Sequence, residues 1–503
     1  MLKFKRIFTV LFVFSILLIL LTILPACSEN AQIEIKSDGE NNETPGSGGA
    51  DTPKPTEKLT ADLPDTLGFD GETFTFFVTG PYWGGYYETF DIYTGEQNGE
   101  TLNDAVYLRN RNVEAKLNIN IAEIKSTNVM NDVMRSVSAG DDIYDAVFSL
   151  GYESPVLAQN GCYINIKDIM YIDLDKPWWD KNLENEMSIL NKLYFTTGDI
   201  STMIKGYTRM IIFNKKLVQE YGLGNPYEHV KNDTWTFDVF AEMGKSIYVD
   251  VNGNGEPDDE DIYGVLRDNE DATRIMLSFG ERITKNDADG YPQIVFNNDR
   301  MINAANKLFD LYYENIGVRN NNLMKPTAGY AEKWTYGRSL FANDKFLFHL
   351  GVPDILEQFR NMESEFGLLP SLKLDASQTR YYHAVDISAV LLGVPVSVKN
   401  LERAGAVLEA MAAESMYTVA PAYNEIMLKR KYVRDEESEF ILDIVNETRT
   451  YDLASLFRWG NMDYMVIDVM QANSRDIASM FEKRYEATIG AIEKTMEAFD
   501  VLK

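Results

Sequence analysis

Short apolar runs alternate with amphipathic stretches through the first third of the chain. Thr73–Thr79 packs aromatic and β-branched residues between two glycines, which predicts a buried strand. Leu117–Ile124 and Asp142–Leu150 are also strand-like, whereas Asn103–Asn112 and Val129–Ala139 look helical. Strands that alternate with helices predict an α/β lobe, in which helices cover a sheet.

The later part of the chain continues this pattern, and 503 residues are enough for two domains or more. Helices are predicted at Thr234–Tyr248, Asn298–Tyr313 and Asn400–Ser415, the last with its asparagine as cap. Ile262–Val265 and Lys345–Gly351 are apolar runs that predict strands. We expect the second of these strands to carry the chain back to the first lobe.

The first 27 residues have the organisation of a secretory signal. Three basic residues are followed by an apolar stretch, and Leu24–Cys27 ends it. A cysteine directly after alanine is similar to the bacterial lipobox, in which that cysteine is diacylated and becomes the mature N-terminus, although Pro25 departs from its usual pattern. We expect Cys27 to carry a lipid anchor. The alternative, an uncleaved membrane span, leads to the same side of the membrane.

Residues 28–65 carry no hydrophobic period, and their Asn, Gly, Ser and Pro content is typical of a flexible tether. The formal net charge of the whole chain is −29. Removal of residues 1–27 takes away three basic residues and leaves 45 against 77 acidic ones, or −32. This charge argues against a nucleic-acid or anionic bilayer surface as partner. Cys162 is the one cysteine beyond the anchor, so no intramolecular disulfide forms, and its apolar surroundings predict a buried thiol.

Several stretches, taken in order, resemble the extracellular solute-binding proteins of bacterial ABC importers, family 1. They are DDIYDAVFSLGYESPVLAQNGCYINI at 141–166, DKPWWDK at 175–181, LYFTTGD at 193–199 and IIFNKKL at 211–217. Their order is similar to that in carbohydrate-binding lipoproteins of the maltose-binding type, and the resemblance covers most of residues 70–460. It implies a two-lobed α/β fold of the periplasmic-binding-protein type II, with a ligand cleft between the lobes.

The resemblance also implies boundaries and a role. Lobe 1 would comprise 66–198 plus 346–397, and lobe 2 would comprise 199–345 plus 398–503. The chain would be a binding component and not an enzyme. It would capture a carbohydrate, expected to be an oligosaccharide, and deliver it to the transmembrane subunits of a permease. We expect a monomer at the extracellular face of the cell membrane, with no nucleic-acid partner.

Sugar rings stack on aromatic side chains, and their hydroxyls bind planar polar groups such as carboxylates and guanidinium groups. We therefore select as ligand-binding residues the aromatic and polar side chains on predicted loops or near the lobe crossing. They are Tyr82, Trp83, Tyr152, Trp178, Trp179, Asp199, Arg209, Trp334 and Asp386. An alternative for the Trp178–Trp179 pair is a packing corner that covers the sheet edge.

The segment Asp250–Asp261 fits the spacing of a twelve-residue calcium loop, with Gly255 at the sharp turn. The ligands would be Asp250, Asn252, Asn254, Glu256, Asp258 and Asp261. Position twelve is an aspartate where glutamate is usual, and a strand instead of a second helix is predicted to follow. Any calcium here would be structural, and the alternative is a solvated acidic turn. No other cofactor is expected.

Three catalytic signatures are missing from the sequence: the Walker loop, HExxH and GxSxG. The three histidines, His229, His349 and His383, show no metal-ligand spacing. Carboxylates are too abundant for motif analysis alone to exclude a glycoside hydrolase. A secreted hydrolase and an adhesive surface protein therefore remain alternatives to a sugar-binding protein, and a peptide remains an alternative ligand.

Overall fold

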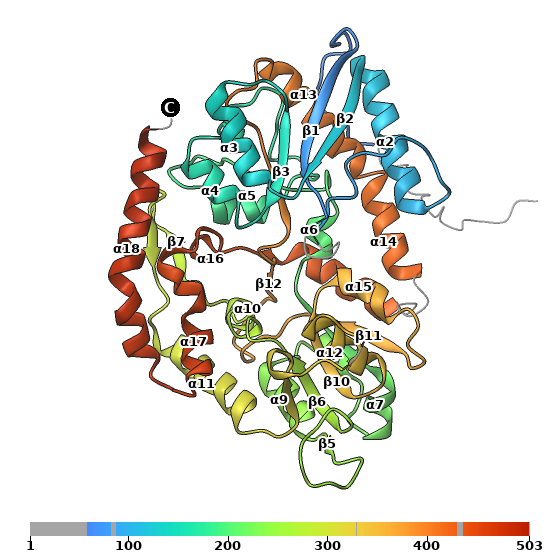
Figure 1. The fold of residues 1–503 in the computed structure, drawn as a ribbon, viewed down its shortest axis with the longest axis vertical. Coiled ribbons are helices and arrows are strands. Elements are labelled where there is room, and N and C mark those ends of the chain that lie inside the picture. Colours follow the sequence, from blue (N-terminus) through green and yellow to red (C-terminus); the bar gives the residue numbers. More distant parts are fainter. Residues whose placement is uncertain (1–57, 82–86, 328, 430–435, 502–503) are drawn as a thin grey trace, which may run out of the picture. The chain divides into compact units, whose positions relative to one another are not determined.

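Four strands form the first sheet of the computed structural model, which describes residues 58–81, 87–327, 329–429 and 436–501 (Figure 1). Their order is β13–β3–β1–β2. Their bounds are β1 Glu72–Thr79, β2 Ile119–Ser126, β3 Ala146–Leu150 and β13 Val390–Gly393. β1 is parallel to β2 and β3, and β13 is antiparallel to β3. The three strands predicted in the first third of the chain are confirmed, and β3 is buried throughout because both of its faces are covered.

Helices accompany this sheet as the sequence predicts. They are α2 Thr101–Leu117, α3 Val129–Ala139, α4 Ser154–Gln159, the 3-10 turn η1 Ile166–Asp168 and α5 Lys181–Met187. The predicted helix at 129–139 has the same bounds in the structure, whereas α2 extends beyond the predicted 103–112 at both ends. Cys162 is buried, as expected, and burial raises the pKa of its thiol.

Six strands form the second sheet, in the order β11–β4–β10–β6–β5, with β9 also paired to β6. Their bounds are β4 Met210–Asn214, β5 Tyr248–Val249, β6 Ile262–Arg267, β9 Val318–Asn320, β10 Phe346–Gly351 and β11 Phe366–Leu369. β6 is parallel to β9 and β10, while β4 is antiparallel to both β10 and β11. Every residue of β4 and β10 is buried, so the core of the second lobe lies on these central strands.

Two predictions of which lobe a segment belongs to are wrong. β10 was expected to return the chain to lobe 1, but it pairs with β4 and β6, and β11 also joins that second sheet. An apolar run shows that a strand is buried but does not show which sheet buries it. At the C-terminal side, α13 (Leu401–Ser415) and α14 (Val419–Lys429) were assigned to lobe 2, but both pack on α2 beside the first sheet.

Three segments cross between the regions of the two sheets. The first runs through Thr196–Arg209 into β4, and the second runs from β12 (His383–Ala384) into β13. They bridge one another at Thr196↔Leu392 and Thr208↔Val385. The third contains β14 (Arg449–Thr450), which pairs with β12. We call these stretches the crossing segments.

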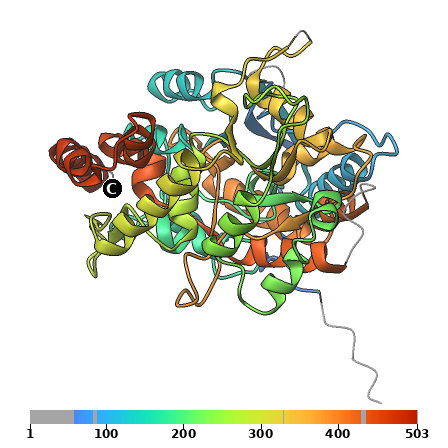
Figure 2. The same ribbon diagram turned by 90° about the horizontal axis from the view of Figure 1, so that it is seen from below.

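The remaining elements surround these cores. The helices are α6 Met203–Gly206, α7 Lys215–Glu220, α8 Pro226–Lys231, α9 Phe237–Lys245, α10 Asp271–Ser278, α11 Asp299–Tyr313, α12 Lys333–Ala342, α15 Glu436–Glu447, α16 Leu453–Phe457, α17 Met465–Gln471 and α18 Ile477–Val501. The 3-10 turns are η2 Asn321–Leu323, η3 Pro353–Phe359 and η4 Trp459–Tyr464, and β7 Thr284–Asn286 pairs with β8 Pro292–Ile294. Figures 1 and 2 both show α17 and α18 side by side. None of the helices in the described ranges is long and apolar enough to cross a membrane.

Candidate ligand-binding site

The carboxyl end of β3 leads directly to the second crossing segment. Gly151 follows β3 and donates its backbone N–H to the carbonyl of Ala389 at 2.8 Å. Tyr152 donates its backbone N–H to the carbonyl of Ile387 at 3.2 Å. A Cβ atom at position 151 would lie 2.9 Å from the Ile387 oxygen, so this close approach requires glycine. The first sheet therefore presents the Tyr152 loop to the segment 386–389.

The second sheet meets the same segment from its other side. Arg209 precedes β4 and donates its backbone N–H to the carbonyl of Ala384 at 2.9 Å, while Asp386 donates its own to the carbonyl of Tyr207 at 2.9 Å. Because β4 is antiparallel to β10, its beginning lies at the carboxyl end of β10. Ligands of open α/β sheets bind outside the carboxyl ends of the strands. Both sheets thus direct their ligand-binding edges to one stretch of chain.

A buried carboxylate lies between two arginines at this point. Asp386 accepts from Arg209 Nη2 at 2.5 Å and from Arg274 Nη2, on α10, at 2.8 Å. Burial alone would raise the pKa of Asp386, but Arg274 and Arg209 hold it well below its usual range. Asp271 lies 3.6 Å from Arg209 and 3.8 Å from Arg274. Burial, reinforced by Asp268, raises the pKa of Asp271 to about 7.

One tyrosine ring lies near these charges, and a second follows β3. Tyr87, on the loop after β1, is half-buried, and its ring centroid lies 5.7 Å from that of Tyr207. Burial and the nearby Asp386 raise the pKa of its hydroxyl. Its backbone has φ of 66°, an unfavourable conformation for a residue with a side chain and one that often marks functional sites. Tyr152 is also half-buried, and the Arg458 guanidinium lies 5.3 Å from its ring centroid.

Three of the predicted ligand residues, Tyr152, Arg209 and Asp386, therefore come together. We call them, with Tyr87 and Arg274, the crossing site. Tyr87 and Arg274 were missed by the sequence analysis. Tyr87 lies in the same aromatic stretch as the selected Tyr82 and Trp83, but it was not itself selected. Nothing in the helical pattern of α10 distinguishes Arg274 from a surface arginine.

The Trp178–Trp179 pair does not reach this site, which corrects its selection as ligand-binding. The two residues are 1% and 5% exposed, and their indole N–H groups donate to Glu409 at 3.1 and 2.8 Å. No ring face is left for a sugar. The alternative interpretation, a packing corner, describes the observed contacts. Gly198 belongs to this corner, because a Cβ atom there would lie 2.1 Å from the Trp178 carbonyl oxygen.

The other selected residues have different surroundings or lie outside the described ranges. Asp199 forms an ion pair with Lys205 at 2.8 Å on the first crossing segment. Trp334 is half-buried on α12. Tyr82, Trp83 and the proposed anchor Cys27 lie outside the described residues, so their roles stay predictions.

The acidic loop forms a network of turns. Asp250 accepts the backbone N–H groups of Gly253 and Gly255 at 2.7 and 2.8 Å. Asp258 accepts from the Asn252 and Asn254 amides at 2.8 and 2.7 Å. Across the described part of the chain, no group of three or more His, Cys, Asp or Glu residues is placed to hold a metal ion. Calcium binding by Asp250, Asn252, Asn254, Glu256, Asp258 and Asp261 stays a prediction.

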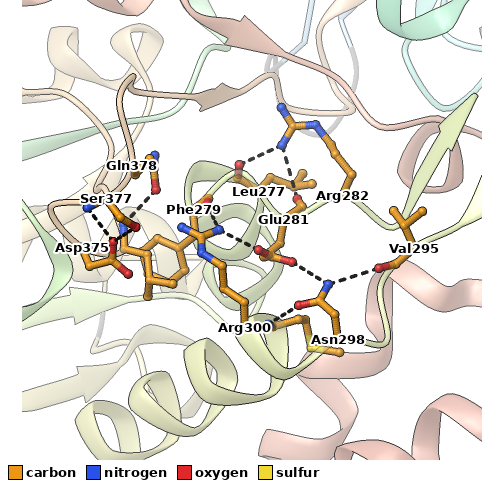
Figure 3. A network of polar contacts seen from close by, with 12 residues as sticks. Leu277, Phe279, Glu281, Arg282, Val295, Asn298, Arg300, Asp375, Ser377 and Gln378 are labelled. Atoms are coloured by element: carbon orange, nitrogen blue, oxygen red, sulfur yellow. Dashed lines mark hydrogen bonds and ion pairs between the residues drawn. The ribbon is translucent and has the colours of Figure 1, made fainter.

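A second charged network lies between α10 and α11, in the same part of the chain as Arg274, and it has a different role from the crossing site. Figure 3 shows Arg300 directed to Glu281, and the two groups form an ion pair of 2.7 Å. Asn298 donates to Glu281 at 3.0 Å and also caps α11 through the Met301 N–H at 2.8 Å. These contacts hold the start of α11 against the turn after α10, so this network stabilises the fold.

Comparisons with known proteins agree with this architecture. No protein-family model matches the chain, and no curated protein matches it by sequence. Solved structures match its fold. The ABC substrate-binding protein Lmo0181 from Listeria monocytogenes, in complex with cycloalternan, has a TM-score of 0.51 at 12% identity, over 86% of this chain and 100% of its own. An ABC transporter solute-binding protein from Thermotoga lettingae, bound with alpha-D-tagatose, has 0.51 at 15%, over 84% and 100%. Apo RafE from Streptococcus pneumoniae has 0.53 at 13%, over 84% and 99%.

The chain therefore has the two-lobed α/β fold of ABC solute-binding proteins, as the sequence resemblance implied.

Proposed function

We propose that this chain captures a carbohydrate outside the cell and delivers it to the permease of an ABC importer. The observation that carries the proposal is the crossing site. It combines the half-buried ring of Tyr87, which lies near Asp386, with the Arg209–Asp386–Arg274 cluster. The half-buried Tyr152 joins it through its backbone hydrogen bond to Ile387. Aromatic faces with a few fixed polar groups suit a sugar. Two fold neighbours carry cycloalternan and alpha-D-tagatose, which supports a carbohydrate in the same role here.

The mechanism would be closure of the lobes around the ligand. Tyr87 and Tyr152 follow strands of the first sheet, whereas Arg209 directly precedes β4 of the second sheet and Arg274 lies on α10. A sugar bound to the tyrosines would form additional contacts with the arginines when the lobes close, or the reverse. The ligand can shift this equilibrium only by its greater affinity for the closed state. The closed form would be the one that the permease binds.

The proposed location rests on the N-terminal sequence. Diacylated Cys27 would anchor the chain at the outer face of the membrane, and residues 28–65 would act as the tether. A flexible tether of about 37 residues spans roughly 35 Å, so the folded part could reach a permease in the same membrane.

Thermal unfolding with a sugar panel tests the function. We expect the chain from Ser28 onward to be stabilised by at least one member of a panel that includes cycloalternan, alpha-D-tagatose, maltotetraose, cellotetraose and mannotetraose. A sugar at 100 times its dissociation constant should add about 2.7 kcal/mol. Chromatography of the mixture should return the sugar intact, whereas a hydrolase would cleave it.

Two arginine variants show where the sugar binds. Arg274→Gln removes a guanidinium from the crossing site, and Arg300→Gln removes one from the ion pair with Glu281 in the same lobe. The first variant should lose most of the ligand-induced shift, and the second should keep it. Equal shifts in both variants would place the ligand elsewhere. No stabilisation by any sugar, together with stabilisation by peptides, would replace the carbohydrate proposal with a peptide one.

A further inference from the structure

The lobe 2 side of the crossing site is a mixed cluster of charges. Asp268 directly follows the strand β6, and its backbone N–H donates to the carboxylate of Asp271 at 2.7 Å. Asp271 in turn faces Arg209 and Arg274, and these two arginines hold Asp386. We call these five residues the charge cluster. It lies where β6 ends and β4 begins, which is the ligand-binding edge of this sheet.

The charge cluster is accessible and has hydrogen-bonding capacity left. The side chains of Arg209 and Arg274 are 17% and 21% exposed, and Asp268 is half-buried. Among the described residues, the buried Nε of Arg209 has no hydrogen-bond partner. A cavity of about 20 Å³ lies against Arg209, Asp271, Arg274 and Ser278, which is room for one water-sized group. A ligand hydroxyl or a bridging water fits these dimensions.

The positive charges of this region are already compensated. Within the charge cluster, two arginines face three aspartates. The next neighbours are Arg267, which lies 4.0 Å from the Tyr312 ring, Arg338 beside His349, and Asp354 beside Tyr207. Burial lowers the pKa of His349 to about 4, so its imidazole is neutral at pH 7. Four arginines therefore nearly balance four aspartates, of which Asp271 is only partly ionised at pH 7 because burial raises its pKa to about 7, within a chain of net charge −29.

A charge-balanced site binds uncharged ligands better than anions. A sugar hydroxyl can donate to Asp268 and accept from an arginine N–H, so it uses both kinds of group. A carboxylate or phosphate can only accept, and in the cavity it would lie beside Asp271, with Asp268 acting electrostatically on the same arginine, Arg209. Repulsion between like charges at short distances is large in a partly buried site and is poorly screened by salt.

We infer that the charge cluster is a subsite for one residue of an uncharged carbohydrate, and that its aspartates exclude uronic acids and sugar phosphates. This inference rests on the proposed function and narrows the class of sugar. Asp268 would be a binding residue, and removal of its charge would weaken the exclusion.

The test uses neutral and acidic probes with two matched variants. The probes are maltotetraose, cellotetraose and mannotetraose against tetragalacturonate, tetramannuronate and glucose 6-phosphate, titrated into the chain from Ser28 onward. Asp268→Asn removes a carboxylate that accepts the Asn321 amide at 3.0 Å. The control Asp344→Asn removes one that accepts the Asn214 amide at 2.6 Å. Asn214 is the last residue of β4, whereas the charge cluster lies where β4 begins. The control therefore lies at the opposite end of this strand.

We expect at least one neutral probe to bind, and every acidic probe to bind at least ten-fold more weakly than it. Asp268→Asn should weaken the binding of neutral probes and lower the ratio of neutral-probe affinity to acidic-probe affinity at least three-fold. Asp344→Asn should leave both the affinity and the ratio unchanged. An acidic probe that binds wild type as tightly as any neutral one overturns the inference while keeping the proposed function. So does an unchanged ratio in Asp268→Asn. If no probe binds wild type, the proposed function falls first, and the inference falls with it.

Discussion

Glu409 provides the most direct test of the tryptophan corner, because one carboxylate holds both indoles. It is fully buried on α13 and accepts Trp178 Nε1 at 3.1 Å, Trp179 Nε1 at 2.8 Å and the Asp173 backbone N–H at 3.3 Å. Burial raises the pKa of Glu409 to about 7, although the indole and backbone donors favour its ionised form. The buried side chain therefore binds a proton more tightly in the folded state than in the unfolded one.

The sign of the pH effect follows from this difference. Above its unfolded pKa of about 4.5, Glu409 ionises in the unfolded chain while the folded chain still holds the proton. Stability falls with rising pH wherever the folded state binds more protons. One pKa unit corresponds to about 1.4 kcal/mol, so Glu409 should cost about 3 kcal/mol of unfolding free energy between pH 4.5 and 7. Above pH 7 the effect should level off.

Glu409→Gln removes this titration and keeps the size of the side chain. Urea unfolding at several pH values from 4.5 to 8 should show that the wild-type protein loses about 2–4 kcal/mol relative to this variant as pH rises. Glu123 and Asp463, whose pKa values burial also raises to about 7, titrate in both proteins and cancel in the comparison. Parallel stability curves for the two proteins would refute the reasoning. At pH 4.5, Glu409→Ala should cost about 3–6 kcal/mol, because it leaves two buried indole donors unpaired and opens a cavity.

Three further predictions concern other parts of the chain. Cys27→Ser should release the protein from the membrane without changing its melting temperature, and continued incorporation of a fatty-acid label would contradict lipidation at this position. Calcium should raise the melting temperature of the wild-type chain but not that of Asp250→Asn, and equal curves for the two proteins with calcium and with chelator would leave the loop as a turn. Tyr87→Ala should weaken sugar binding at least ten-fold by calorimetry. Tyr87→Gly, which suits φ of 66° better, should weaken it equally but be about 1 kcal/mol more stable than the alanine variant.

Local structure was more predictable than the arrangement of the sheets. The bounds of α3 and the side-chain cap of α13 by Asn400 agree with the sequence, because periodicity and capping act within a few residues. The destination of β10 was mispredicted, since hydrophobicity does not specify a partner strand. Tyr248 was expected to end a helix but lies in β5, where it pairs with Tyr263 after a sharper end of α9 at Lys245. Tertiary pairing decided both cases.

Of the candidate site residues too, those marked by local sequence were predicted, and those that depend on distant contacts were not. Arg209 and Asp386 were selected because they flank predicted strands near the crossing, and the structure places them in one ion pair. Trp178 and Trp179 were selected because aromatic rings suit sugars and the pair precedes the predicted crossing, but both are buried, and their indole N–H groups bind Glu409, some 230 residues later in the chain. No pattern local to DKPWWDK reveals such a distant acceptor. Arg274 was missed for the same reason, because its importance comes from Asp386 across the fold.

The position of Asp386 connects these contacts to closure. Its backbone lies on a crossing segment that bonds to Tyr207 on one side, and Tyr152 bonds to the next residue, Ile387, on the other. Its carboxylate is held by Arg209, at the end of the first crossing segment, and by Arg274 on α10. In the proposed function, a sugar hydroxyl that takes an arginine N–H would compete with Asp386 or add to it, so ligand binding and lobe closure would share the same charged groups. A substitution that alters the Asp386 pairing would then change both the ligand contacts and the segment about which the lobes are proposed to move.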